Sequence, residues 1–291
     1  MQWPGASRKD LLREAIGLID RGRKRENKNL GQPRFHHDAG NENAPLRGNS
    51  TCLEVRSAAG QVFVVDAGSG IRNFGRALRG EPEIAQIRFF LTHAHWDHLV
   101  GFPFFEPAYS DRYVFTFCNG AHAQDAIRKY LSRQMEAPYF PVEFQHLKAR
   151  FCFRCECPNA EDRNCQLSGL EVRAFPLSHL NGGYGFRFSE NGKTFLFLTD
   201  NELAVQHPGG WTREQYVDFC RGADLLFHDA QYTPEEYRYT RGWGHSTFGD
   251  AVDLALDAGV KRLGLFHHDP ERSDDDLDRQ TDLCREKIKA A

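Results

Sequence analysis

The chain has 291 residues, 40% of them hydrophobic, and a formal net charge of −3, a composition typical of a globular protein of one large or two ordinary domains. Its apolar runs are too short for a membrane-spanning helix, and the N-terminus has no apolar segment that would direct secretion. We therefore expect a cytoplasmic protein without a membrane partner, and the acidic balance argues against one built to bind long nucleic acid.

Residues 1–47 are predicted to form a separate N-terminal region. Apolar residues at helical spacing between Arg8 and Asp20 indicate an amphipathic helix. The basic run Arg21–Lys28 follows, either as a solvated helix end and linker or as a contact for RNA or an acidic partner. The main domain is predicted to span residues 48–291.

From residue 49 onward, short apolar runs of strand character dominate. In the first half, strands are predicted at 51–56, 61–66, 87–91 and 113–117, and helices at 70–79 and 121–135. In the second half, strands at 170–175, 183–188, 194–200, 224–229 and 261–266 are interspersed with helices at 212–221, 248–257 and 274–289. This alternation predicts a layered α/β fold.

The most informative stretch follows the predicted strand at 87–91 and places His93, His95, Asp97 and His98 within six residues. A strand that ends in His-x-His-x-Asp-His points alternate imidazoles one way and then turns, which brings a carboxylate and a third imidazole to the same point. Neutral imidazole and carboxylate are ligands that Zn²⁺, Mn²⁺ or Fe prefer. A chance cluster is the alternative, because the chain has thirteen histidines, but this spacing at a strand end favours a metal site.

Polar residues of the same kind follow later predicted strands. They are His179, Asp200, the pair His228 and Asp229, and His267. Each of them alone would more often be structural than catalytic. Their recurrence after successive strands favours one constellation, because strand ends gather at the edge of a sheet.

Four cysteines offer a second candidate metal site: Cys152, Cys155, Cys157 and Cys165. Their spacing is not a common zinc pattern, and a strand would send Cys152 to the opposite face from Cys155 and Cys157. Reduced cysteines on a hairpin are the favoured interpretation, and a structural zinc ion is the alternative.

The motif at 93–98 and the order of the later strand-end residues resemble the metallo-β-lactamase superfamily over about residues 48–280. The resemblance implies an αββα sandwich, in which two mixed sheets are flanked by helices. It also implies seven ligands for two divalent metal ions: His93, His95 and His179 for the first, Asp97, His98 and His267 for the second, and Asp200 as a bridge. Zn is the expected metal for both, with Mn or Fe as alternatives.

Two further assignments come from the same resemblance. His267 is preferred to His268 because it directly follows the strand, and His268 is the fallback. Asp66, which ends the strand at 61–66, is expected to orient a ligating imidazole, since such ligands usually need a hydrogen-bond acceptor behind them.

Three later motifs narrow the resemblance to ribonuclease Z and related phosphodiesterases: His228-Asp-Ala-Gln-Tyr232, Gly244-His-Ser-Thr247 and Phe266-His-His-Asp-Pro270. In that group the histidine of the Gly-His-Ser-Thr motif lies beside the metals. The resemblance thus implies that His245 protonates the leaving group or steadies the phosphate. We expect Asp229 to orient His245, and Asp97 to act as both ligand and catalytic residue.

The expected function is a dinuclear metal-dependent phosphodiesterase that cleaves a small or cyclic nucleotide with a metal-bridging hydroxide. Ribonuclease Z carries a long arm rich in Gly and Pro that grips tRNA, and the sequence contains no such insertion. Three alternatives stay open: an RNA-processing nuclease of the ribonuclease Z type, a lactone or ester hydrolase on the same metals, and a binding module whose metal site has decayed.

The sequence departs from the superfamily at its start, where the usual first strand and its Gly-Arg-Gly-Ser turn are absent. Either another element fills that position in the sheet or a partner subunit covers the edge. Superfamily members near ribonuclease Z are often dimers, so the resemblance is also compatible with a homodimer.

Overall fold

The computed structural model describes residues 34–35, 49–118, 121–153, 164–167 and 169–291. The predicted helix at 8–20, the basic run at 21–28, and Cys155 and Cys157 lie outside these residues. The predicted domain boundary at residue 48 falls at the edge of a range that is not described, and it stays a prediction. The described residues fall into two compact units, one of residues 34–35 and 49–173 and one of residues 174–291.

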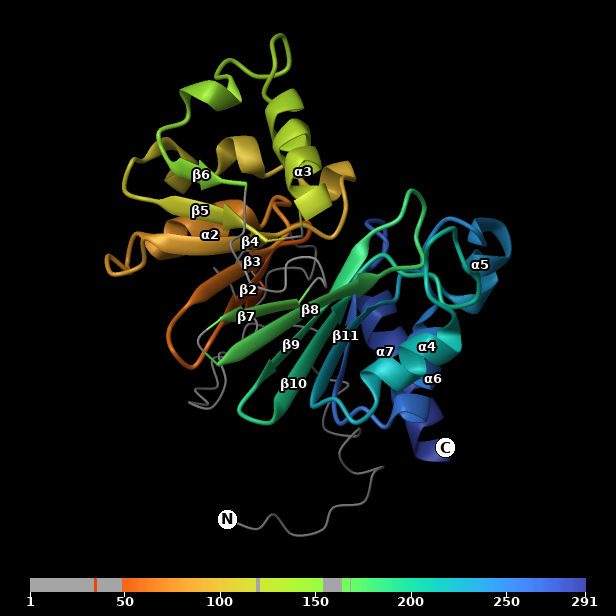
Figure 1. Cartoon of the computed structure of the whole chain (residues 1–291). Helices are drawn as coiled ribbons and strands as arrows, with labels where there is room; N and C mark the ends of the chain where they lie inside the picture. The colour runs from red at the N-terminus through yellow and green to blue at the C-terminus, as the bar shows by residue number, and fades with distance from the viewer. Residues whose placement is uncertain (1–33, 36–48, 119–120, 154–163, 168) are drawn as a thin grey trace. The chain divides into compact units, whose positions relative to one another are not determined.

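The first unit is built on a six-stranded mixed sheet in the order β1-β2-β3-β4-β5-β6 (Figure 1). Its strands are β1 (Arg34–Phe35), β2 (Leu53–Arg56), β3 (Val62–Val65), β4 (Gln86–Phe90), β5 (Val114–Phe117) and β6 (Arg150–Cys152). The first three strands pair antiparallel, and β3 to β6 pair parallel. Parallel pairing of β3 with β4, in the register Val65↔Phe90, brings the residues that follow both strands to one edge.

Strand β1 lies in the region that was predicted to be a helix and linker. It pairs with β2 through Arg34↔Glu54 and Phe35↔Leu53. A different element, β1, therefore fills the sheet position of the superfamily's usual first strand. A partner subunit is not needed to cover that edge.

The core of the first unit lies between its sheet and the helices α2 (Ile71–Leu78) and α3 (Ala121–Arg133). Helix α2 buries Ile71, Phe74 and Leu78 on one face, as the helical spacing requires. Phe89 of β4 contacts the rings of Phe105, Phe115 and Phe117, in a core that also includes short 3₁₀ turns at Phe102–Phe104, Glu106–Tyr109 and Phe144–His146. This packing supports the strand end from which the His-x-His-x-Asp-His motif starts.

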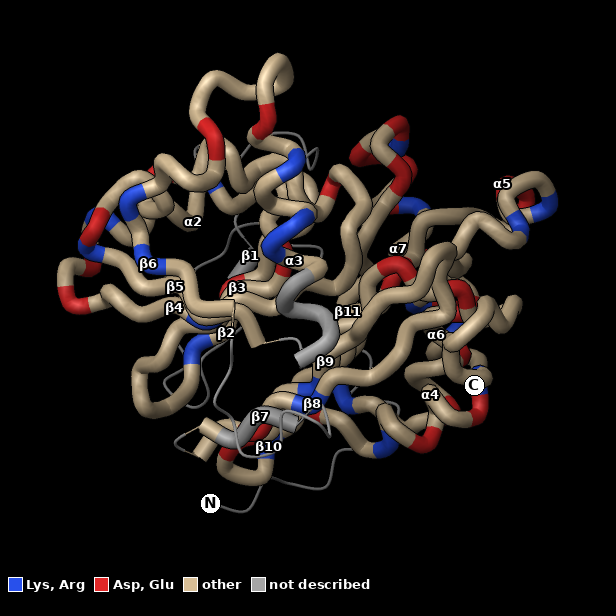
Figure 2. Tube along the Cα trace, turned by 45° about the horizontal axis from the view of Figure 1, so that its top comes forward, with Lys and Arg blue, Asp and Glu red and all other residues tan. Residues whose placement is uncertain are grey.

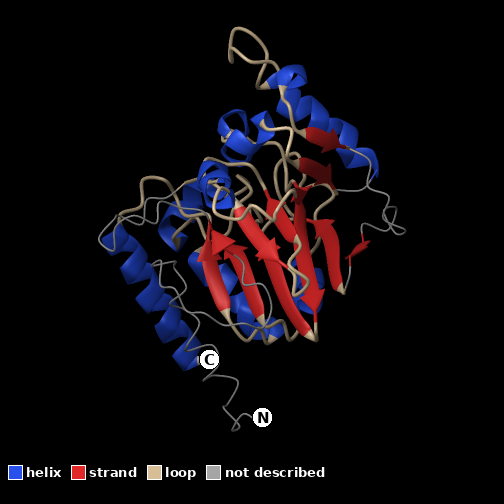
Figure 3. Cartoon of the chain, turned by 90° about the vertical axis from the view of Figure 1, so that its left-hand side faces the viewer, coloured by secondary structure: helices blue, strands red, loops and turns tan. Residues whose placement is uncertain are grey.

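The second sheet has the strand order β12-β11-β10-β9-β8-β7. Its strands are β7 (Asn164–Leu167), β8 (Leu170–Pro176), β9 (Tyr184–Glu190), β10 (Lys193–Leu198), β11 (Leu225–Asp229) and β12 (Leu263–Phe266). Strands β10, β11 and β12 are parallel, so the residues after them share an edge (Figure 3). Strand β7 was not predicted.

Helices α4 (Arg213–Cys220), α6 (Phe248–Ala258) and α7 (Asp274–Ala290) pack on one side of β10 to β12 (Figure 1). Helix α6 ends where predicted, at Gly259, whose φ of 63° is the left-handed conformation that glycine adopts without strain. Helix α5 (Pro234–Thr240) was not predicted. Mixed sheets covered by helices confirm the predicted α/β class.

We predict that Thr212→Ala lowers the free energy of unfolding by about 1 kcal/mol, because Thr212 forms a capping box with Gln215 at the start of α4. Urea unfolding followed by circular dichroism measures this change. Thr212→Ser, which keeps the hydroxyl group, should unfold close to the parent protein, and an equal loss in both variants would contradict the capping role.

Candidate metal centre

The predicted ligands of the first unit follow β4 without a break. His93 and His98 are buried, and η1 (Trp96–His98) turns the chain back after His95. The ring centroid of His93 lies 4.4 Å from that of His95 and 4.2 Å from that of His98. The Asp97 side chain is 45% exposed, and its Oδ2 lies 3.1 Å from His98 Nε2. Three imidazoles and one carboxylate thus converge within this unit.

Asp66 and Thr92 orient two of these imidazoles from behind. The buried Asp66 carboxylate accepts hydrogen bonds from Thr92 N (2.7 Å), from Thr92 Oγ1 (2.8 Å) and from His98 Nδ1 (2.7 Å). Because the Thr92 hydroxyl donates its proton to Asp66, its oxygen can accept the Nδ1 proton of His93 at 3.0 Å. Both rings then keep their proton on Nδ1 and present the Nε2 lone pair, which a metal ligand requires.

The environment of Asp66 sets its pKa in two opposed ways. Burial raises the pKa of this carboxyl, and the hydrogen bonds and charge of His98, together with those from Thr92, lower it. The net direction is upward. Asp66 has the orienting position that was expected from the sequence.

The predicted ligands of the second unit come from three separate loops and meet at Asp200. His179 follows β8, Asp200 follows β10 and His267 follows β12. Asp200 Oδ2 lies 3.8 Å from His179 Nε2, and Asp200 Oδ1 lies 3.3 Å from His267 Nε2. One carboxylate therefore faces two imidazoles with different oxygens, which is the arrangement that a bridging ligand needs.

The tautomer of His179 is fixed by the backbone. Its Nδ1 lies 2.9 Å from the carbonyl oxygen of Gly244, and it must donate its proton there because the carbonyl can only accept. Nε2 is left as the atom with a free lone pair, on the side of Asp200.

Three residues that follow β3, β10 and β12 have left-handed backbones although none of them is glycine. The φ angles are 65° at Asp66, 51° at Asp200 and 54° at His267. Such a conformation costs on the order of 1–2 kcal/mol and tends to occur at functional sites, where the surroundings hold it. The left-handed backbone changes the direction of the chain after each of these strands.

His245 and Asp229 form a close pair beside this group. Asp229 Oδ2 accepts the His245 Nδ1 proton at 2.6 Å, and Asp229 Oδ1 accepts from Ser246 N at 3.0 Å. The His245 ring stacks on His267, with centroids 4.9 Å apart and planes at 10°. Ligand atoms of Asp229, His245 and His267 lie within 4.8 Å of one another. The structure thus brings together the pair that the sequence motifs predicted.

The donor set within each unit fits divalent metal ions. Imidazole Nε2 atoms and carboxylate oxygens dominate both groups, and their separations of up to 4.8 Å leave room for an ion between pairs such as His93 with His95, or Asp200 with His267. Hydrogen bonds behind the rings fix the direction in which they can bind.

Comparison with known proteins identifies the family. A family model described as "Beta-lactamase superfamily domain" matches residues 61–268. The chain belongs to this superfamily. It is 26% identical to the ribonuclease Z of Brevibacillus brevis over 254 residues, which cover 76% of this chain and 79% of the relative.

Solved structures of low sequence identity share the fold. The short form of human tRNase Z has a TM-score of 0.54 and 20% identity over 83% of this chain and 91% of its own. The metallo-beta-lactamase fold protein YhfI from Bacillus subtilis has a TM-score of 0.58 and 13% identity over 86% of this chain and 89% of its own. These structures confirm the predicted αββα fold. The family model and the ribonuclease Z relative together support the prediction of a ribonuclease Z-like hydrolase of the metallo-β-lactamase superfamily. Among the described residues, no helix is long and apolar enough to cross a membrane.

The hydrolase also contains a buried carboxylate that was not predicted. Glu202 accepts hydrogen bonds from His207 Nε2 (2.7 Å), Gly242 N (2.7 Å), Gly244 N (2.8 Å) and the Tyr237 hydroxyl. Burial raises its pKa, but these hydrogen bonds outweigh burial, and the pKa lies below its usual value. Glu202 thereby fixes the loop whose Gly244 carbonyl holds His179.

Asn201 and Ser246 join the same loops. Ser178 N donates to Asn201 Oδ1 at 2.8 Å, and the Ser246 hydroxyl donates to the Asn201 carbonyl oxygen at 2.6 Å. Leu203 N donates in turn to Ser246 Oγ at 3.0 Å. No spacing in the sequence marks these contacts, which join residues between 23 and 45 positions apart.

Other sequence candidates lie away from the ligand groups. His268 stacks on Phe248 at 5.6 Å, while its neighbour His267 faces Asp200. Phe102 is buried against Phe144 in the core of the first unit. Cys152 lies in β6 and Cys165 in β7, whereas Cys155 and Cys157, the other two cysteines of the candidate zinc site, lie outside the described residues.

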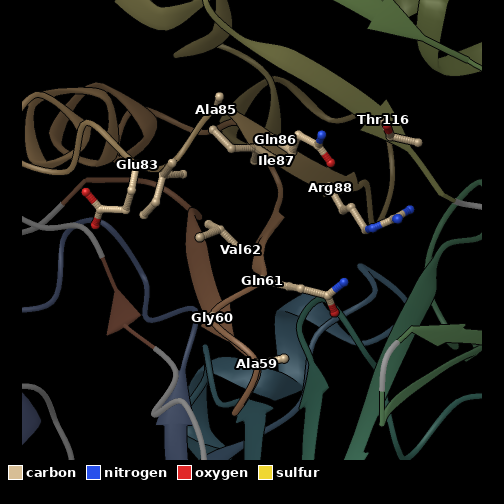
Figure 4. Close-up of a pocket in the computed structure, with 11 residues that line it drawn as sticks. Ala59, Gly60, Gln61, Val62, Glu83, Ala85, Gln86, Ile87, Arg88 and Thr116 are labelled. Carbon is tan, nitrogen blue, oxygen red and sulfur yellow. The ribbon is translucent and has the colours of Figure 1, made fainter.

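A cavity of about 360 Å³ lies at the other end of the first sheet (Figure 4). Residues at the amino ends of β3 and β4, among them Gln61, Gln86 and Arg88, line it. Because Asp66 and His93 follow the carboxyl ends of the same strands, the cavity and the ligand group lie at opposite ends of these strands. Its lining contains no histidine or cysteine, so it adds nothing to the metal centre.

We predict that Gly244→Ala destabilises the protein by roughly 3 kcal/mol or more, measured as the free energy of unfolding in urea. Gly244 has a φ of 94°, and a Cβ there would lie 2.1 Å from His179 Nδ1. Gly242→Ala is the matched control, because its φ is 89° and a Cβ would meet nothing within 4 Å. It should cost only about 1–2 kcal/mol of backbone strain. Equal losses would show that contact with His179 is unimportant.

Proposed function

We propose that this hydrolase is a dinuclear metal-dependent phosphodiesterase and that its substrate is RNA. The observation that carries the proposal is the Asp229–His245 pair beside Asp200 and His267, since a phosphodiester with a poor leaving group needs a proton donor next to the metals. The relative named ribonuclease Z, which aligns with 76% of the chain, favours RNA as the class of substrate.

The metal ligands are proposed as a set that draws on both units, since the family match at residues 61–268 includes both ligand groups. His93, His95 and His179 would hold one ion, Asp97, His98 and His267 the other, and Asp200 would bridge them. The position of Asp200 between His179 and His267, and of His268 against Phe248, supports the choice of His267. When bound, two divalent ions supply positive charge for the phosphoryl oxygens and a nucleophile at neutral pH, and Zn is the first candidate.

His245 is proposed to protonate the departing oxygen from its Nε2 atom. Asp229 accepts the Nδ1 proton, which orients the ring and stabilises the doubly protonated imidazolium that a proton donor must form. Stacking on His267 holds the ring plane. Asp97, whose carboxylate is half exposed beside His98, is the second proposed catalytic residue.

A small or cyclic nucleotide is the second candidate substrate. The net charge of −3 and the lack of an arm rich in Gly and Pro favour it, but the relatives support RNA better. A homodimer also remains a proposal.

The experiment that tests the proposed function uses protein purified without chelator, with its metal content measured in the same sample. Substrates are a single-stranded oligoribonucleotide, 2′,3′- and 3′,5′-cyclic nucleotides and bis-p-nitrophenyl phosphate, with a lactone and a β-lactam as controls. Hydrolysis of the oligoribonucleotide with about two metal ions per chain supports the proposal. Asp200→Ala, which removes the proposed bridge, should lose metal and turnover together, whereas the surface variant Asp253→Ala should keep both. Turnover of the lactone alone by the parent protein would contradict the proposed phosphodiesterase activity.

We predict that His245→Ala keeps the bound metal and lowers kcat on the oligoribonucleotide by roughly 10²–10⁴. The loss should be smaller on bis-p-nitrophenyl phosphate, because p-nitrophenolate leaves without a proton. Asp229→Asn should show the same dependence on the leaving group. Equal losses on both substrates would refute proton donation, and loss of metal would make His245 a ligand instead.

A further inference from the structure

The segment that leads into His245 combines exposed aromatic and basic side chains. Tyr239 is 85% exposed at the end of α5, and Trp243 is 59% exposed in the following turn. Arg238 and Arg241 are also exposed and alternate with them in the sequence Arg-Tyr-Thr-Arg-Gly-Trp. We call residues 238–243 the aromatic–basic segment.

The two arginines differ from most exposed arginines of the same unit. Among the described residues, neither Arg238 nor Arg241 forms an ion pair with a carboxylate. In contrast, Arg279 and Arg285 of α7 pair with Asp276 and Asp282. The acidic residues of α5 lie in its first turn, and one of them, Glu236, is paired with Arg272. The basic residues lie at the other end of the helix (Figure 2). Positive charge is therefore available for an anionic ligand.

The segment is held in place rather than loosely attached. Glu202 accepts hydrogen bonds from the Tyr237 hydroxyl and Gly244 N, which bracket the segment, and from Gly242 N within it. Tyr232 and Thr247, which precede and follow the segment in the sequence, pair in a parallel bridge. A preorganised surface loses less entropy when it binds a ligand.

The segment adjoins the proposed catalytic residues. Trp243 precedes Gly244, whose carbonyl oxygen binds His179, and His245 follows directly. Leu180, next to His179, is also exposed. A chain bound across these side chains would lie next to the scissile position.

We propose that the aromatic–basic segment binds an unpaired stretch of the RNA substrate, with Trp243 and Tyr239 stacked on bases and Arg238 and Arg241 at phosphates. This inference rests on the proposed function and extends it to single-stranded RNA at this surface. Aromatic faces bind any unpaired base, and arginines bind the backbone, which together give sequence-tolerant recognition of single strands.

The test measures binding without turnover. A fluorescein-labelled 2′-O-methyl oligouridylate is titrated with the metal-loaded enzyme, and the dissociation constant is read from fluorescence anisotropy at several salt concentrations. Trp243→Ala should weaken binding by about 5- to 150-fold, the range that corresponds to loss of one stacked base. In Arg238→Ala/Arg241→Ala, the slope of log K against log salt should fall by about 1.4, since two phosphate contacts are lost.

Matched controls come from α7. Arg279→Ala/Arg285→Ala changes the net charge by the same amount, and Leu283→Ala removes an apolar side chain of similar exposure to Trp243. These variants should bind the oligonucleotide as the parent does. Equal weakening in the α7 variants, or parent-like binding by the segment variants, would overturn the proposal.

A duplex of the same length separates stacking from simple charge attraction. Because paired bases do not offer their faces, Trp243→Ala should weaken single-strand binding more than duplex binding, and equal effects would overturn the stacking role. Hydrolysis of bis-p-nitrophenyl phosphate by the same samples reports the chemistry independently of this surface. An active enzyme whose segment variants bind RNA normally refutes only this inference, whereas an inactive parent refutes the proposed function.

Discussion

The candidate centre depends on where each imidazole keeps its proton. A histidine can bind a metal ion only through a nitrogen that carries a lone pair, and the acceptor on the opposite nitrogen decides which one that is. In this chain a hydroxyl, a carboxylate and a backbone carbonyl perform the same task for His93, His98 and His179. Each hydrogen bond contributes only about 1 kcal/mol to stability, but each fixes a ring direction.

The predicted ligands and the residues that orient them come together because parallel strands end at a common edge of each sheet. Asp66 and His93 follow adjacent strands of the first sheet, and Asp200, Asp229 and His267 follow or end adjacent strands of the second. A strand that simply continued would carry these side chains past the edge. The left-handed backbones at Asp66, Asp200 and His267 turn the chain at that point, and the buried sheets on which they stand offset the strain.

Much of this arrangement could be predicted from the sequence, because its signals are local. The His-x-His-x-Asp-His run, the apolar strands before each polar residue, and the caps Thr212 and Thr247 all lie within a few positions of what they specify. The role of His245 came from the family resemblance, and Asp229 was added as the residue expected to orient it. Glu202 could not be found in this way, because its partners lie up to 42 residues away without a repeating pattern.

Two missed elements show different limits. Strand β1 has only two residues and rests on pairing with β2, so no periodicity could reveal it. Helix α5 has seven residues, too few for a helical repeat, yet Thr233 and Glu236 form a capping box whose spacing is visible in the sequence. That signal was available, and it would have placed a helix directly before the Gly-His-Ser-Thr motif.

The net charge also says less about a candidate ligand surface than the local arrangement of charges does. Fields from exposed charges fade over roughly 8 Å at physiological salt, so the total of −3 says little about the surface next to His245. There, Arg238 and Arg241 stand beside exposed aromatic rings. Glu202 anchors that surface through Gly242 and the ring of His179 through Gly244, so one buried carboxylate fixes both the proposed RNA contact and a proposed metal ligand. The same carboxylate therefore positions the proposed binding surface and the proposed ligand, so substitutions that probe the proposed binding alone must change exposed side chains rather than Glu202.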